Sequence, residues 1–177
     1  APTGTFTLGD ANCEAMGGSW SGSTCTLDQN YTLPAGDTLH IPSGITLTIN
    51  DIFNNYGTIE NNYSGTIINY DTINNHNAAI LNTDGTINNE GAINNHNGAI
   101  IHNFNSGTII TDGTFNNDGR TINNYSGLIR NDGTFNNDGT FNNDGTFNND
   151  GTFNSDGTIT GNDIIDNQPY AETASTG

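Results

Sequence analysis

Basic residues are almost absent from this chain. Among its 177 residues there is no lysine, and Arg120 and Arg130 are the only two strong bases, against 19 acidic residues, which gives a formal net charge of −17. A surface of this charge repels phosphate backbones and anionic lipid head groups. Nucleic acids and acidic membrane surfaces are therefore excluded as expected partners.

Large apolar residues are also scarce. Hydrophobic residues make up 31% of the chain, with one Met and one Trp, and no apolar run is long enough to cross a membrane. This content is low for a globular domain and, taken alone, is typical of disorder. Disorder is rejected because the apolar residues recur at a fixed short period, which a solenoid can bury by stacking copies of one unit.

A six-residue repeat dominates what is present. Residues 133–156 have the sequence GTFNND GTFNND GTFNND GTFNSD. Thr-Phe-Asn alternates polar and apolar residues, as a short strand with one buried face does. Asn-Asp-Gly is turn chemistry, because Asn, Asp and Gly accept left-handed backbone. Each hexad therefore predicts one strand and one corner.

Related units of six or eight residues extend back to residue 57, and three of them give a turn of 18–22 residues. We therefore expect an all-β fold, a three-sided β-solenoid of about six or seven turns over 51–160. Phe135, Phe141 and Phe147 should point inward from the three sides. The many Asn side chains can stack as amide ladders, each donating to the next turn. A strict hexad suits a left-handed helix and the irregular corners a right-handed one, so the handedness stays open.

Residues 11–50 have a different composition and predict an N-terminal cap and first coil. Cys13 and Cys25 are the only cysteines. They predict a disulfide that closes a short loop, with a free thiol pair as the alternative. Trp20 lies in this loop and could cover the open end of the column. The start at Ala1-Pro2, without an initiator Met, fits a mature N-terminus after signal removal or an artificial start.

The segment CTLDQNYTLPAGDTLHIPSGITLTI, followed by GTINN units, resembles secreted Asn/Gly-rich β-solenoid surface and fibre proteins of archaea and bacteria. The resemblance covers about residues 13–160. It implies an extracellular or cell-surface location and a role as adhesin, fibre or stalk, and it carries no catalytic residue.

Acidic residues close the last hexads. Stacked carboxylates at the strand spacing of about 4.8 Å repel one another unless they are solvated or bridged by a hard cation. Solvated corners are the favoured interpretation, and no cofactor is required. The candidate Ca²⁺ ligands are Asp138, Asp144, Asp150 and Asp156.

Asn30, Asn62 and Asn124 begin Asn-x-Ser/Thr sequons, which predict glycosylation at exposed corners or arise by chance in an Asn-rich chain. His76 and His96 occur in matching INNHN contexts. They are interpreted as exposed corner residues, with a transition-metal site as the alternative.

The two ends of the chain suggest self-assembly. Residues 1–10 contain Gly-Thr-Phe, the triplet of the repeat, and predict a free donor strand, although the arm could fold back on its own cap. Residues 161–177 form a tail with no obvious cap, so the last turn should expose a strand edge and a Phe-rich floor. Strand addition between such ends is head-to-tail and gives a filament. The predicted joint residues are Thr5, Phe6, Thr7, Leu8, Phe147, Phe153 and Ile159.

The sequence therefore predicts a structural subunit of an extracellular filament that assembles with itself. The alternatives are a monomeric cell-surface adhesin or stalk and, with less support, an ice-binding protein with outward Thr ladders. No nucleophile–base pair or carboxylate pair is apparent, and a filled column offers no cleft, so an enzyme is not expected.

Overall fold

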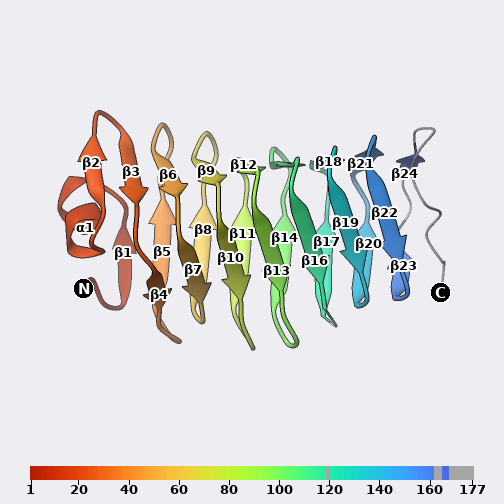
Figure 1. The fold of residues 1–177 in the computed structure, drawn as a ribbon, viewed down its shortest axis with the longest axis horizontal. Coiled ribbons are helices and arrows are strands. Elements are labelled where there is room, and N and C mark those ends of the chain that lie inside the picture. Colours follow the sequence, from red (N-terminus) through yellow and green to blue (C-terminus); the bar gives the residue numbers. More distant parts are fainter. Residues whose placement is uncertain (119, 162–164, 168–177) are drawn as a thin grey trace.

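The computed structural model shows a column of short β-strands wound into about seven turns, with the N-terminal elements at one end and the last strands at the other (Figure 1). It describes residues 1–118, 120–161 and 165–167. Three sheets run along the column, which confirms the predicted three-sided β-solenoid. One short helix, α1 (Asp10–Ala15), lies at the N-terminal end.

The three sheets, named A, B and C, have eight, nine and seven strands. In spatial order, sheet A consists of β1 (Thr5–Thr7), β5 (Thr38–Ile41), β8 (Thr58–Asn61), β11 (Ile80–Thr83), β14 (Ile100–Asn103), β17 (Thr121–Asn124), β20 (Thr140–Asn143) and β23 (Thr158–Thr160). Sheet B consists of β2 (Ser19–Ser21), β3 (Thr24–Leu27), β6 (Thr46–Ile49), β9 (Thr66–Asn69), β12 (Thr86–Asn89), β15 (Thr108–Thr111), β18 (Leu128–Asn131), β21 (Thr146–Asn149) and β24 (Ile165–Asn167). Sheet C consists of β4 (Tyr31–Leu33), β7 (Ile52–Asn55), β10 (Thr72–Asn75), β13 (Ala92–Asn95), β16 (Thr114–Asn117), β19 (Thr134–Asn137) and β22 (Thr152–Ser155).

The chain visits the sheets in the order B, C, A in each turn, so equivalent residues of successive turns lie side by side. In sheet C, Ile73 pairs with Ile93, and the same column continues through Phe115, Phe135 and Phe153. The spacing along this column lies between 18 and 22 residues, as the sequence predicts. Every pairing of described strands is parallel except that of β2 with β3.

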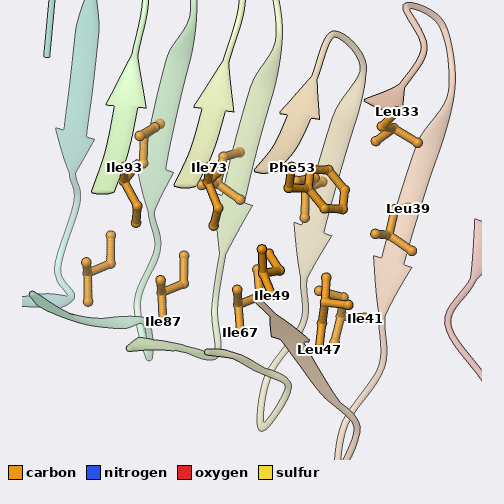
Figure 2. Close-up of a cluster of buried hydrophobic side chains, with 14 of the residues drawn as sticks. Leu33, Leu39, Ile41, Leu47, Ile49, Phe53, Ile67, Ile73, Ile87 and Ile93 are labelled. Atoms are coloured by element: carbon orange, nitrogen blue, oxygen red, sulfur yellow. The ribbon is translucent and has the colours of Figure 1, made fainter. Parts of the chain in front are cut away.

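Each strand of the repeat places its second and fourth residues inside the column. The second is usually Ile or Phe, and these side chains form a continuous apolar core (Figure 2). Phe135, Phe141 and Phe147 meet in the interior from sheets C, A and B, with ring centroids 5.2–5.3 Å apart. The prediction of one inward Phe from each side of a turn is confirmed.

The fourth residue of most repeat strands is an Asn that is almost fully buried. Its amide nitrogen donates twice to the next turn: Asn75 Nδ2 lies 3.0 Å from Asn95 Oδ1 and 3.1 Å from the carbonyl oxygen of Ile100. The predicted Asn ladders are therefore present. The expectation that this second Asn of the hexad belongs to the turn was wrong, because the strand continues one residue further and points the side chain inward.

A second ladder lies on the outer surface and has the opposite polarity. On sheet C, Asn94 Nδ2 donates to Asn74 Oδ1 at 3.0 Å, toward the N-terminal turn, whereas the buried amides donate toward the C-terminal turn. The outer ladder of sheet C is continuous from Asn54 to Asn154. The side-chain dipoles of the two ladders therefore oppose each other along the column axis.

The buried ladders are interrupted where Thr replaces Asn. Thr83 and Thr111 each accept a hydrogen bond from the Asn of the preceding turn, at 3.1 and 2.9 Å. The Asn that follows each of them, Asn103 or Asn131, has an amide oxygen that is buried without a hydrogen-bond partner. Each Thr therefore accepts a hydrogen bond from the Asn amide of the preceding turn, but leaves the Asn amide oxygen of the following turn without a donor.

The glycines of the hexads are required for space, which corrects the expected left-handed backbone. In the repeat tract, positive φ among the described residues occurs at Ser64, Asn77 and Gly98, all in eight-residue units. A Cβ atom added to Gly133 would instead lie 2.0 Å from the carbonyl oxygen of Gly113 in the preceding turn. At Gly133 the two turns lie so close that only a residue without a side chain fits.

Candidate functional site

The N-terminal arm is part of the column. Strand β1 pairs in parallel with β5 of the same chain, with Phe6 opposite Leu39. Phe6 and Leu8 are buried, whereas Thr5 and Thr7 are exposed. The structure therefore shows the arm folded back on its own cap, the alternative to a free donor strand, because its apolar face already fills the end of the core.

The helix α1 and a disulfide close this end. Cys13 of α1 is bonded to Cys25 of β3, as predicted, and both are fully buried. Gly18 lies so close that an added Cβ would be 2.8–3.0 Å from the two sulfur atoms. Trp20 of β2 is partly buried against the same core. The cap is therefore a covalently fixed plug, and the side chains inside it leave room only for glycine at residue 18.

The three sheets begin differently at this end. In sheet A, the side chain of Asn12 in α1 donates to the carbonyl oxygen of Thr7 at 2.7 Å, so one acceptor on the outer edge of β1 is occupied. Sheet B begins with the antiparallel strand β2. Sheet C begins with β4, which pairs only with β7 among the described strands. The edge of β4 is therefore a parallel edge that pairs with no described strand on its outer side.

Tyr31 of β4 has an unusual environment. Its side chain is 7% exposed and packs against Phe53, with ring centroids 5.2 Å apart. Its hydroxyl oxygen is buried and has no hydrogen-bond partner among the described residues. Burial, followed by the negative charge of Asp37, raises the pKa of the Tyr31 hydroxyl. A polar group without a partner therefore lies in the strand that forms the open edge.

At the C-terminal end, the described residues present no exposed Phe-rich floor. Phe147 and Phe153 are fully buried, and Ile159 is only partly exposed. Strand β24 continues sheet B beyond β21, with Ile165 in register with Phe147. The last described strands of sheets C, A and B are β22, β23 and β24. The apolar residues predicted for a joint thus stabilise their own chain, and what remains at this end is strand edges. Most of the predicted tail, residues 162–164 and 168–177, lies outside the described residues.

The acidic residues form columns on separate corners. Between sheets B and C the stacked carboxylates belong to Glu90, Asp112, Asp132 and Asp150. Asp138 and Asp156 are stacked between sheets C and A, and Asp144 lies on the third corner. The four candidate Ca²⁺ ligands are therefore spread over three corners, because successive hexads occupy successive sides. No group of three or more His, Cys, Asp or Glu residues suited to a metal ion occurs in the described part of the chain.

The three sequons have different environments. Asn30 is exposed and Asn62 is partly exposed on a corner, although the side chain of Asn30 also accepts from the backbone of Ile52. Asn124 is 1% exposed and belongs to a buried ladder, where its Nδ2 donates to Asn143 Oδ1 at 2.7 Å. The NNYS motifs of Asn62 and Asn124 are offset by one residue relative to the strand, so only the first places its sequon Asn outside. A glycan on Asn124 is incompatible with this fold.

The two histidines interpreted as exposed corner residues lie on one corner, where they are stacked and partly buried. The rings of His76 and His96 are parallel, 4.9 Å apart, and Tyr56 stacks on His76 at 4.5 Å. The Nε2 atom of His76 lies 3.0 Å from Asn54 Oδ1, a contact of the outer ladder. Burial, and then the proximity of His96, lowers the pKa of His76. The arrangement is a π-stack whose nitrogens contact neighbouring amides. Tyr56, which no sequence motif singles out, occupies the same corner position one turn earlier.

The described residues enclose no pocket, and none of their helices has the length and apolar character needed to span a membrane. Comparison with family models, curated proteins and solved structures finds no match. The candidate functional features are therefore the two ends of the column and its outer faces.

Proposed function

We propose that this chain is the structural subunit of an extracellular filament, in which columns stack end to end and continue their sheets from one copy to the next. The observation that carries the proposal is the pair of uncovered parallel edges, β4 at one end and β22 with β23 at the other. Strands β4 and β22 belong to the same parallel sheet and therefore run in the same direction. An end-to-end contact between these two ends uses different surfaces on each copy, does not close, and produces a linear polymer.

Chemistry supports the extracellular part of the proposal. The Cys13–Cys25 disulfide fixes the cap and persists in an oxidising compartment. The amide ladders and hydrogen-bonded edges make a rod whose sides are polar, so lateral aggregation is disfavoured while the ends remain available. The joint differs from the predicted one: β1 belongs to its own column, and the strand edges rather than buried Phe residues are available for contact.

Electron microscopy of the purified chain tests this function. If sheet B, the longest, is continuous through the joint, each copy adds nine strand spacings, or about 43 Å at ~4.8 Å each. We expect filaments with an axial repeat near this value. Because acidic columns continue past each joint, assembly should increase with salt over the range in which the Debye length falls below about 10 Å. Isolated rods at all protein and salt concentrations would contradict the proposal and favour the monomeric adhesin or stalk.

One face favours a second candidate, an ice-binding surface. The outside of sheet C carries the continuous Asn ladder from Asn54 to Asn154 beside a row that includes Thr72, Thr114 and Thr134. The other two faces are less regular than the sequence repeat suggests. For example, Glu60 and His102 interrupt sheet A. Thermal hysteresis that is lost in Thr114→Lys but retained in a Lys variant on sheet A would support this function; its absence in the wild-type chain would reject it.

A further inference from the structure

We propose that the outer face of sheet C is an interface with a second copy of this chain, which lies antiparallel to the first and covers it face to face. This inference rests on the proposed filament and specifies how two filaments associate side by side. Because the sides of the column are polar, such a contact requires a partner whose hydrogen-bonding groups and charges match those of this face.

Sheet C presents no ionisable side chain on its outer face. Strand β4 places Thr32 outside, and each strand from β7 to β22 places Ile, Thr or Ala at its first position and Asn at its third. By contrast, His40, Glu60 and His102 point outward from sheet A. Arg130 points outward from sheet B. In a chain with a formal net charge of −17, sheet C is therefore the face that a second copy can approach with the least electrostatic repulsion.

The outer Asn ladder has hydrogen-bonding capacity beyond its own contacts. Asn94 donates to Asn74 at 3.0 Å and accepts from Asn116 at 2.9 Å. A side-chain amide has two N–H donors and two acceptor positions, so one of each remains at Asn94 after these contacts within the described ladder. A partner can use such groups along the whole face only if its own polar groups recur once per turn. A second copy meets this condition, because the strand separation of a β-sheet sets the spacing of both ladders.

The charges along the corner that follows sheet C determine the orientation of the second copy. Three earlier turns carry an aromatic ring directly after the strand, and three later turns carry a carboxylate there. These residues are Tyr56, His76 and His96 in the earlier turns and Asp118, Asp138 and Asp156 in the later ones. A two-fold axis that runs along the strands between β13 and β16 places β7 opposite β22, and β10 opposite β19. Each ring of one copy then lies opposite a carboxylate of the other, and no two of these carboxylates meet.

A parallel second copy would bring acidic residues together. The corner before sheet C carries Glu90, Asp112, Asp132 and Asp150. In a parallel pair this corner faces the corner that follows sheet C at the same height, so three like-charged pairs meet: Asp112 with Asp118, Asp132 with Asp138, and Asp150 with Asp156. In the antiparallel pair this corner faces its own copy, and of these four residues only Glu90 and Asp112 meet. Since opposed like charges destabilise an interface, the antiparallel orientation is favoured.

The size of the face explains why this contact depends on filaments. Sheet C extends along the column from β4 to β22 (Figure 1). Six spacings of ~4.8 Å and strands of four residues at ~3.3 Å give a face of roughly 29 by 13 Å, or about 380 Å² per copy. This is about half of the roughly 800 Å² per partner that stable complexes bury. Two single copies therefore pair weakly, whereas two filaments repeat the contact at every subunit and associate through avidity.

Three identical hexads provide a matched test of the face. Residues 133–138, 139–144 and 145–150 all have the sequence GTFNND, and their strands lie in sheets C, A and B. Thr134→Glu places a carboxylate on sheet C, and Thr140→Glu places the same group in the same local sequence on sheet A. In electron micrographs we expect wild-type and Thr140→Glu filaments in pairs. For Thr134→Glu we expect at least a tenfold lower fraction of paired filaments, with the axial repeat unchanged.

A charge swap tests the antiparallel register. In this register Thr72 of β10 lies opposite Thr134 of the second copy, whereas in a parallel pair it would lie opposite another β10. Thr72→Lys combined with Thr134→Glu should therefore restore pairing, because each Lys meets a Glu of the other copy. Within one chain the two residues are three strand spacings apart, about 14 Å, so the recovery does not come from an internal ion pair. A double variant that forms no more pairs than Thr134→Glu would overturn the antiparallel interface.

The outcomes separate this inference from the proposed function. Wild-type filaments that remain single would overturn the inference and leave the filament function intact, whereas an absence of filaments would reject both. Single filaments whose thermal hysteresis is lost in Thr134→Glu but retained in Thr140→Glu would assign the face to ice instead of a second copy. Equal loss of pairing in the two Glu variants would also contradict the inference, because net charge rather than sheet C would then control lateral association. Circular dichroism of every variant is the control for folding.

Discussion

The first coil and the repeat turns place different residues at the same inward position. In the first coil, the fourth strand position holds Leu27, Leu33, Ile41 or Ile49, whereas from Asn55 onward it holds mainly Asn. Both sets are buried. The first coil is therefore stabilised there by apolar contact alone, and the later turns by amides that connect neighbouring turns. At the boundary between these regions, Asn61 pairs with Ile41 and Asn69 with Ile49. Their amide oxygens are buried without hydrogen-bond partners, because the preceding turn offers no amide donor.

The glycines differ between the same two regions. Gly36 and Gly44 of the first coil have positive φ, of 88° and 81°, and an added Cβ would meet nothing within 4 Å. Gly133 of the repeat is crowded by the backbone of the preceding turn. Glycine is therefore needed in the first coil because the backbone has positive φ, and at Gly133 because there is no space for a side chain. One residue type at one kind of corner is thus selected by two unrelated physical requirements.

The largest effect is expected from placing a side chain at a glycine that is crowded by the preceding turn. Gly133→Asn inserts a side chain against the carbonyl oxygen of Gly113 and should lower the free energy of unfolding by about 3 kcal/mol, the upper end for overpacking. Gly36→Asn should cost well under 1 kcal/mol, because Asn accepts positive φ and the site is open. Urea denaturation of both variants measures the difference. Equal losses at the two positions would remove the distinction between conformational and steric glycines.

The next effect concerns the buried amides. Asn95 accepts from Asn75 and donates to Asn117. Asn95→Leu introduces the residue type that the first coil uses, but it leaves a donor of Asn75 and the amide oxygen of Asn117 buried without these partners. Since each unpaired group costs about 1–3 kcal/mol, we expect a loss of about 3 kcal/mol. Asn97→Leu on the exposed corner of the same turn is the control. A nearly neutral Asn95→Leu would show that the ladder adds little to apolar packing.

These two regions were not equally predictable from the sequence. The period of Ile and Phe gave the three sides, the turn length and the inward Phe residues, because burial of one apolar residue per hexad leaves few alternatives. The inward direction of the second Asn was missed, although strand alternation carried one residue beyond Thr-Phe-Asn would have placed it inside. A polar residue at a buried position is favourable only when residues of adjacent turns form hydrogen bonds with it. The local sequence pattern does not show which residues those are.

The candidate site was harder to predict for the same reason. The cysteine pair was sufficient to predict the disulfide, since it could pair only with itself. The open edge of β4 could not be predicted, because it depends on β1 and β2 joining sheets A and B rather than sheet C. Those contacts are set by tertiary packing of the cap. The triplet Gly-Thr-Phe near the N-terminus was recognised as a repeat strand, but its position within its own column follows only from the structure.

A smaller, opposite effect should follow from completing a ladder. In Thr83→Asn, the new amide can accept from Asn61 and donate to the unpaired oxygen of Asn103. One recovered hydrogen bond contributes about 1 kcal/mol, which for a chain of this size raises Tm by about 3 °C. Thr83→Val, which removes the acceptor of Asn61, should lower Tm instead. Calorimetry of the two variants distinguishes ladder chemistry from packing volume, since destabilisation by both would indicate that the position tolerates only Thr.

The smallest effect is expected at the stacked histidines, which extend the comparison from the interior to the corners. Because the pKa of His76 is lowered in the folded chain, the unfolded chain binds the proton first as pH falls through about 6.5. The contribution of neutral His76 to stability is therefore complete above this pH and is lost below it, as protonation places a charge beside His96. His76→Asn should flatten part of the decline in unfolding free energy between pH 7.5 and 5.0. His40→Asn, on the first coil and outside the stack, is the control measured by the same urea titrations. If both variants change the pH dependence of the unfolding free energy equally, the proximity of His76 to His96 is not the cause of that dependence.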